Sequence, residues 1–170
     1  MTSLQDIFQV ILIGIGATAF MDLWLMLVKR MGVPTLNFAL LGRWVGHLFQ
    51  GRFAHPSISK AEPIQHEAAW GWITHYATGM AFAALLVIVQ GAGWAAHPTP
   101  GPAIAVGACT VIAPLFVMQP AMGAGFASSR TPTPLKNCLR SLVNHTVFGL
   151  GLYLSATVIA ALFAAMVRPA

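Results

Sequence analysis

Charged side chains are scarce in this sequence. Only 8% of its 170 residues are Asp, Glu, Lys or Arg, and just four of them are acidic, whereas a soluble domain carries about 25% charged residues. The polar surface of a soluble domain cannot be built from this composition. Because 57% of the residues are hydrophobic and the mean hydropathy is +0.74, we expect an integral membrane protein whose main partner is the lipid bilayer.

The sequence also contains few signals for disulfides or nucleic acid. Its two cysteines form no CxxC pair: Cys109 lies in an apolar run and Cys138 in a basic connection, so no disulfide is expected. The net charge is +5, but the nine Lys and Arg lie between or beside apolar runs, without a basic face interleaved with aromatic residues. We therefore predict no binding to nucleic acid.

Four apolar runs are long enough to cross a bilayer, which takes about 20 helical residues. They comprise residues 7–28, 68–89, 103–122 and 142–167. No Lys or Arg precedes the first run, so we expect it to be a retained helix and not a cleaved signal peptide. Pro114 and Pro120 predict a kink in the third. Since the four runs use most of the chain, the sequence predicts one all-α domain, a bundle of four transmembrane helices.

The basic residues are distributed unevenly among the connections between these runs. The first connection has five Lys or Arg and the third has three, while the second connection and the N-terminal tail have none. Basic connections normally face the cytoplasm. The distribution therefore predicts that the first and third connections are cytoplasmic and that both termini are periplasmic.

A short amphipathic helix is predicted within the first connection, at residues 37–50. Its apolar side chains recur at helical spacing, and Arg43 and His47 fall on the opposite face. Asn37 or Thr35 would cap its start. This pattern is typical of a helix lying in the membrane interface. Its Arg43 and His47 would cover a site in the bundle or bind an anionic head group.

Three ionisable residues lie within the predicted spans, where such groups are unfavourable and usually functional. At a rise of 1.5 Å per residue, Asp22, His75 and His145 lie about 10, 12 and 8 Å from the cytoplasmic boundary. Gln119 lies near the same boundary in the third run. Small residues recur at every fourth position beside the three ionisable residues, which favours close helix packing. We therefore predict that Asp22, His75 and His145 meet in the cytoplasmic half of the bundle.

The first hypothesis for this site is a metal centre. Two imidazoles and one carboxylate are the ligand set of non-haem iron(II) sites and also suit zinc. Asp22, His75 and His145 would be the ligands. Their orientation would be fixed by the polar neighbours Thr18, Gln119 and Asn144.

A variant of this hypothesis is haem b held between His75 and His145. Glycines near both histidines would make room for the macrocycle, and Arg43 or Arg140 would pair with its propionates. Asp22 has no role in this arrangement.

Two alternatives need no cofactor. In a proton relay or proton-coupled transporter, Asp22 would titrate against a buried histidine, and a four-helix transporter would have to form a homodimer. In a non-catalytic scaffold or assembly factor, Asp22 would only tie two helices together by pairing with His75 or His145. The sequence leaves both open and assigns no reaction.

Five segments of the sequence stand out together: GIGATAFMDLW, LNFALLGRWVGHLFQGRF, GWITHYATG, FVMQPAMGAGFASSRTP and RSLVNHTVFGLGLYLS. They resemble a domain-of-unknown-function family of small bacterial inner-membrane proteins, and the resemblance extends over nearly the whole chain. They contain Asp22, Arg43, His47, His75, Gln119, Arg140 and His145. The resemblance implies a bacterial source, an inner-membrane location and a single four-helix domain, and it implies no activity.

Overall fold

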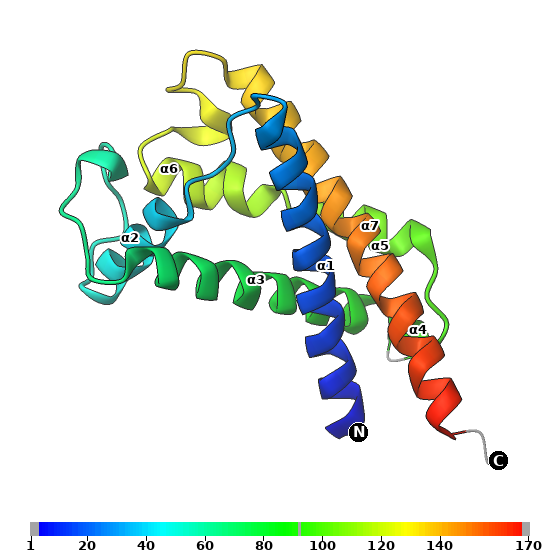
Figure 1. Cartoon of the computed structure of the whole chain (residues 1–170). Helices are drawn as coiled ribbons and strands as arrows, with labels where there is room; N and C mark the ends of the chain where they lie inside the picture. The colour runs from blue at the N-terminus through cyan, green and yellow to red at the C-terminus, as the bar shows by residue number, and fades with distance from the viewer. Residues whose placement is uncertain (1–3, 92, 168–170) are drawn as a thin grey trace.

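The chain is helical, with four helices that can span a membrane (Figure 1). The computed structural model describes residues 4–91 and 93–167, and no strand occurs within these ranges. The segments that are long and apolar enough to span are α1 (Leu4–Arg30), α3 (Glu67–Gln90), Pro100–Ala121 and most of α7 (Pro134–Val167). The predicted all-α fold with four spans is confirmed.

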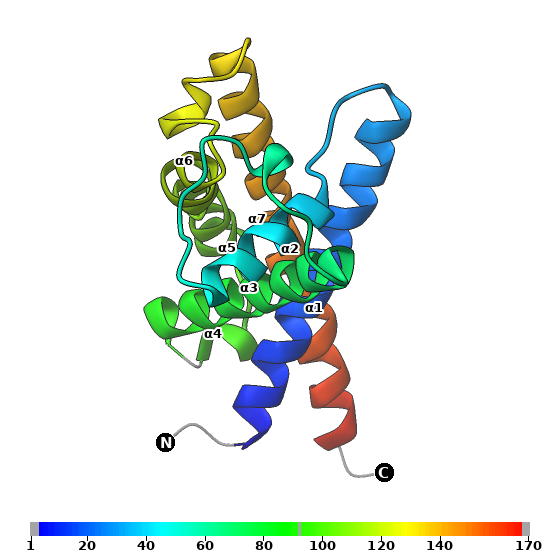
Figure 2. The ribbon, with the colours of Figure 1, turned by 90° about the vertical axis from the view of Figure 1, so that its left-hand side faces the viewer.

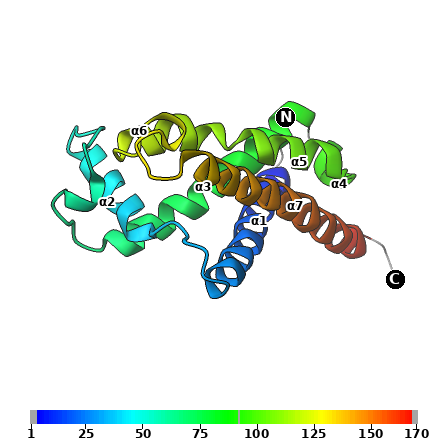
Figure 3. The same ribbon diagram turned by 90° about the horizontal axis from the view of Figure 1, so that it is seen from above.

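The spans pack pairwise, and the chain forms two ends. α1 packs along α7 and against α3, and α5 (Pro100–Cys109) packs along α7. α1 begins and α7 ends at one end of the molecule, while the loops that follow α1 and α6 (Gln119–Ala121) lie at the other (Figure 2). α2 (Phe38–Phe49) and α6 lie on one side, away from α4 (Gly93–Ala96) (Figures 1 and 3).

Small residues allow the helices to approach closely. A Cβ atom added to Gly14 of α1 would lie 2.5 Å from the Met80 Cα atom of α3, and Gly107 of α5 meets the backbone of Gly149 in α7. The buried core between these helices is apolar; it includes Ile13, Ala17, Ala83, Leu86, Phe148 and Leu152. The glycines therefore set the helix spacing, and larger apolar side chains fill the remaining space.

The third span is irregular, as its prolines predict. α5 ends at Cys109, and a turn at residues 110–111 interrupts the regular helix before a π-helical stretch, η2 (Pro114–Met118), which leads into α6. Proline cannot donate a backbone hydrogen bond, so the regular helix is interrupted. Thr110 caps the C-terminal end of α5 just before this interruption, and its side chain contacts His145 of α7.

α7 begins at Pro134, earlier than the apolar run that starts at residue 142. Its first turns carry Lys136 and Arg140, which end the hydropathy signal without ending the helix. Proline is favoured in the first turn of a helix, where its missing N–H group has no helical partner. The basic start of α7 therefore extends beyond the apolar run and carries Arg140 on a rigid helix.

α2 is the short helix predicted between the first two spans. The Asn37 side chain accepts a hydrogen bond from the backbone N–H of Ala39 at 3.0 Å and so caps its start. α2 packs tightly on the first turns of α3, because Gly42 contacts the backbone of Glu67 and Gly71 contacts the carbonyl of Phe38. α2 is therefore joined to α3 as one unit.

Candidate functional site

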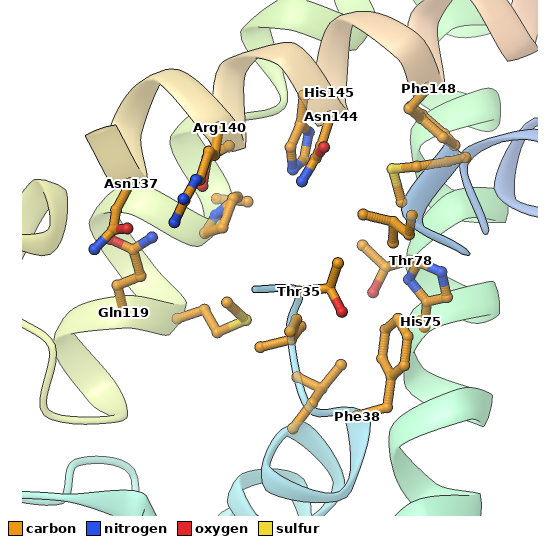
Figure 4. A pocket seen from close by; sticks show the side chains of 18 of the residues that line it. Thr35, Phe38, His75, Thr78, Gln119, Asn137, Arg140, Asn144, His145 and Phe148 are labelled. Atoms are coloured by element: carbon orange, nitrogen blue, oxygen red, sulfur yellow. The ribbon is translucent and has the colours of Figure 1, made fainter. Parts of the chain in front are cut away.

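A pocket of about 530 Å³ lies among α1, α2, α3, η2 and α7. Figure 4 shows Arg140, Asn144 and His145 pointing into it from α7, with Phe38, His75 and Thr78 across from them. Apolar side chains make up most of its remaining wall, among them Met21, Leu25, Leu41, Phe82 and Phe148. The pocket wall is therefore mostly apolar, and we call the side formed by Gln119, Asn137, Arg140 and Asn144 its polar edge.

Asp22, His75 and Tyr76 form a hydrogen-bonded group between α1 and α3. His75 Nε2 lies 2.8 Å from Asp22 Oδ1, and the Tyr76 hydroxyl donates to Asp22 Oδ2 at 2.9 Å. A carboxylate oxygen only accepts, so Nε2 carries the proton that His75 donates. His75 lines the pocket, and within the described part of the chain its Nδ1 atom has no hydrogen-bond partner. The predicted proximity of Asp22 and His75 is observed, and Tyr76 completes the group.

His145 lies in the wall of the same pocket but has a different partner. Its Nδ1 atom is 2.8 Å from Thr110 Oγ1, and the Thr110 hydroxyl donates to the Gly107 carbonyl. Because that hydroxyl proton is already used, Nδ1 must be the donor to Thr110 Oγ1. This tautomer leaves Nε2 of neutral His145 as an acceptor.

The three predicted metal ligands do not form one cluster. Asp22 binds His75, and His145 binds Thr110. Across residues 4–91 and 93–167, no group of three His, Cys, Asp or Glu side chains is placed to hold a metal ion. The metal centre stays a prediction, and these contacts give it no support.

The predicted neighbours Thr18, Gln119 and Asn144 all line the pocket. Thr18 donates to the Gly14 carbonyl at 2.8 Å and lies against Gly79, so it serves the contact between α1 and α3. Asn144 Oδ1 accepts from Trp24 Nε1 at 2.9 Å, and Gln119 Oε1 accepts from the Ser128 hydroxyl at 2.8 Å. Both amides are thus held in place through their oxygen atoms.

Arg43 and His47 lie outside the pocket. Arg43 is 9% exposed and forms a two-point ion pair with Glu67, with Nε–Oε2 and Nη2–Oε1 distances of 2.8 and 3.0 Å. Its Nη1 atom reaches three carbonyls in the loop before α3, at residues 58, 59 and 61. The hydrogen bonds that Arg43 donates to the Glu67 carboxylate raise the pKa of Arg43 above its ordinary value. Arg43 therefore fastens α2 to α3.

His47 is buried and, like Arg43, joins α2 to the loop before α3. Its Nε2 atom lies 3.0 Å from the Glu62 carbonyl, and its Nδ1 atom lies 2.7 Å from His55 Nε2. The carbonyl can only accept, so His47 donates from Nε2, and His55 donates to His47 Nδ1. The polar face of α2 is consequently turned toward the protein and not toward water or lipid head groups.

Sequence reasoning did not identify Tyr76, Thr110 or Asn137 as site residues. Tyr76 follows His75 directly, and a single polar residue beside a histidine is too weak a signal. Thr110 is the C-terminal cap of α5, and it reaches His145 through the packing of α5 along α7, which the sequence pattern does not predict. Asn137 lies before the apolar run, in a part of α7 that hydropathy assigns to a connection.

A match to a protein-family model identifies the family of this chain. The model described as a protein of unknown function (DUF2938) matches residues 11–159, which include every pocket residue named above. No curated protein and no solved structure matches the chain. The matched region covers most of the sequence and part or all of each of the four spans. The chain therefore belongs to the DUF2938 family.

Proposed function

We propose that this protein binds an amphipathic small molecule from the bilayer in the pocket, and that the Asp22–His75 pair accepts a proton there. The observation that carries the proposal is the pocket itself, with about 530 Å³ of space enclosed mainly by apolar side chains and bordered by polar ones. Ligand sites typically have volumes of about 300–1,000 Å³ and this mixture of groups.

The distribution of side chains favours an elongated ligand with one polar end. Met21, Leu25 and Phe82 offer contact to hydrocarbon, whereas Arg140 and Asn144 supply hydrogen-bond donors on α7. A molecule that is entirely polar would leave the apolar wall without favourable contacts. A molecule that is entirely apolar would remove the polar groups from water without replacing their hydrogen bonds.

The Asp22–His75 pair has the arrangement of a proton acceptor. Asp22 accepts hydrogen bonds from both His75 and Tyr76, so its charge is held beside the imidazole. The contact of Asp22 with His75 Nε2 fixes the tautomer of His75 and leaves its Nδ1 atom as the basic nitrogen. A proton taken up at Nδ1 would produce an imidazolium stabilised by the adjacent carboxylate. This arrangement supports the proton-relay alternative for the pair.

The proposal includes an orientation in the bacterial inner membrane. The end of the molecule with the loops after α1 and α6 carries Lys29, Arg30 and Arg130, so we assign it to the cytoplasm. The pocket then opens in the cytoplasmic half of the bundle, and both termini are periplasmic.

Photolabelling tests ligand binding directly. The probe is palmitic acid with a diazirine in its chain, incubated with the purified protein in lipid nanodiscs, and labelled peptides are identified by mass spectrometry. We expect labelling of pocket segments in α1, α3 and α7. The Thr78→Phe variant fills the pocket and should lose this labelling, while Ile88→Phe, at a 78% exposed position of the same helix, should keep it. Labelling that is unchanged in Thr78→Phe would contradict the proposal.

Haem is a second candidate ligand, favoured by the contact of His145. A haem-binding histidine commonly donates from one ring nitrogen to a neighbour and ligates through the other, and Thr110 engages Nδ1 of His145. The test is an absorption spectrum of protein purified from haem-supplemented cells, beside a His145→Ala variant. A Soret band in the parent alone would favour haem, and its absence from the parent would reject this candidate.

A further inference from the structure

We infer that the polar edge of the pocket binds a phosphate monoester carried on a hydrocarbon chain, with Arg140, Asn144 and Gln119 as its hydrogen-bond donors. The inference rests on the proposed binding function and names the class of ligand. It follows from the hydrogen-bonding groups that remain free after the internal contacts of the protein are assigned.

Arg140 is a cation without an internal counterion. It lines the pocket and points into it (Figure 4), and within the described ranges it forms no ion pair or hydrogen bond. The contrast with Arg43 is informative, since Arg43 is paired with Glu67 and bound by three loop carbonyls. A guanidinium beside an apolar pocket is most stable with an anion, and its planar array of N–H groups suits a phosphate.

Asn144 presents its amino group to the same space. The indole N–H of Trp24 can only donate, so the Asn144 atom that it contacts must be the oxygen. The NH₂ group of Asn144 is left without an internal acceptor in the part of the chain that the structure describes. Trp24 therefore fixes the direction of the amide and makes Asn144 a donor toward the pocket.

Gln119, the first residue of α6, is also held through its amide oxygen. Its oxygen accepts from the Ser128 hydroxyl at 2.8 Å, which leaves its NH₂ group to donate. Asn137 is oriented the other way, since its amino group donates to Thr131 at 2.9 Å. The polar edge thus offers three donors, the Arg140 guanidinium and the amino groups of Asn144 and Gln119. The Asn137 oxygen is left to accept from a protonated phosphate. Phosphate has several acceptor oxygens, which match this set better than a neutral hydroxyl does.

The apolar wall identifies the source of the phosphate as a lipid. Met21, Leu25 and Phe148 line the same pocket as Arg140. Free phosphate would occupy only the polar edge, whereas a phosphate on a hydrocarbon chain would fill both parts. His75 lies across the pocket from Arg140 and Asn144 (Figure 4), so this histidine, which is bonded to Asp22, would face the ligand and not its charged end.

The test compares two probes that differ only in their head group. Phosphatidic acid and diacylglycerol carry the same diazirine-bearing chain and are offered to the protein in phosphatidylcholine nanodiscs. We expect preferential labelling by phosphatidic acid in the parent. The preference should be lost in Arg140→Gln and retained in Lys136→Gln, which removes the same charge from the same helix at a position outside the pocket.

A second variant tests the donor pattern without breaking the helix contact. Asn144→Asp keeps an oxygen for Trp24 but replaces the amino donor with a negative charge, so it should also abolish the preference while the protein stays folded. Equal labelling by both probes in the parent would overturn the inference and leave the binding function standing. No labelling by either probe would overturn both. Millimolar inorganic phosphate should leave the labelling in place, and complete displacement by it would contradict a lipid-borne phosphate.

Discussion

Three histidines of this protein each have their tautomer set by one specific neighbour. Asp22 selects the proton on His75 Nε2, Thr110 selects the proton on His145 Nδ1, and the Glu62 carbonyl selects the proton on His47 Nε2. Two of these histidines face the pocket and one does not. At the scale of single residues, the structure therefore separates histidines that can meet a ligand from one that holds the protein together.

The Asp22 group should contribute measurably to stability. Asp22→Ala leaves the His75 Nε2–H and the Tyr76 hydroxyl without their acceptor, so we expect a loss of about 1–3 kcal/mol in the free energy of unfolding. Tyr76→Phe removes one of the two bonds and should have a smaller effect. Unfolding in detergent can be followed by intrinsic fluorescence. Thr157→Val, on the exposed surface of α7, is the control. An unchanged stability of Asp22→Ala would show that this group does not hold α1 on α3.

Acid should loosen the loop that joins α2 to α3. Burial, together with the nearby His47 imidazole and Arg52 guanidinium, lowers the pKa of His55 below its ordinary value, and the buried Nδ1 atom of His55 has no partner among the described residues. The unfolded chain therefore binds more protons than the folded one, and stability falls as pH decreases below about 6.5.

Hydrogen exchange of residues 47–66 at pH 5 and pH 8, corrected for intrinsic rates, measures this effect. We expect weaker protection at pH 5 in the parent. His55→Gln can still donate to His47 Nδ1 but does not titrate in this range, so it should reduce the difference. Equal protection of the parent at both pH values would contradict the prediction.

At the scale of helices, the glycine contact between α2 and α3 is the most exacting one. A Cβ atom at Gly42 would overlap the backbone of Glu67, which cannot move aside without shifting the helix. We expect Gly42→Ala to destabilise the protein by about 1–3 kcal/mol, as overpacking typically does. Gly101→Ala, in α5 with open space around it, is the matched control and should be neutral. Thermal unfolding of both variants in the same detergent makes the comparison.

The helices were largely predictable from sequence because hydropathy directly reports the apolar length that a bilayer requires. The start of α7 could not be predicted in this way, because the helix begins at Pro134, before the apolar run, and its first turns carry Lys136. The pairing of Asp22 with His75 followed from their common depth. The partner of His145 did not, since Thr110 reaches it through the packing of α5 along α7, which hydropathy does not predict. Arg43–Glu67 pairing likewise depends on how α2 folds back onto α3.

At the scale of the whole molecule, α1 begins and α7 ends at the same end of the structure (Figure 2), and we expect this end to lie on one side of the membrane. The uneven distribution of Lys and Arg predicts that this side is the periplasm. A C-terminal fusion to alkaline phosphatase, which is active only in the periplasm, should be active in cells. A matching fusion to green fluorescent protein should remain dark. A fluorescent and phosphatase-inactive pair of fusions would reverse the orientation and put the pocket in the opposite half of the bilayer.

The bond between Trp24 and Asn144 has an optical consequence. Indole emission responds to the charge and polarity around its N–H group, and here that group is bonded to the amide that borders the pocket. A charged group placed beside the Asn144 amide would therefore alter the surroundings of the Trp24 indole, across the contact between α1 and α7. The protein thus carries its own fluorescent reporter at the edge of its pocket.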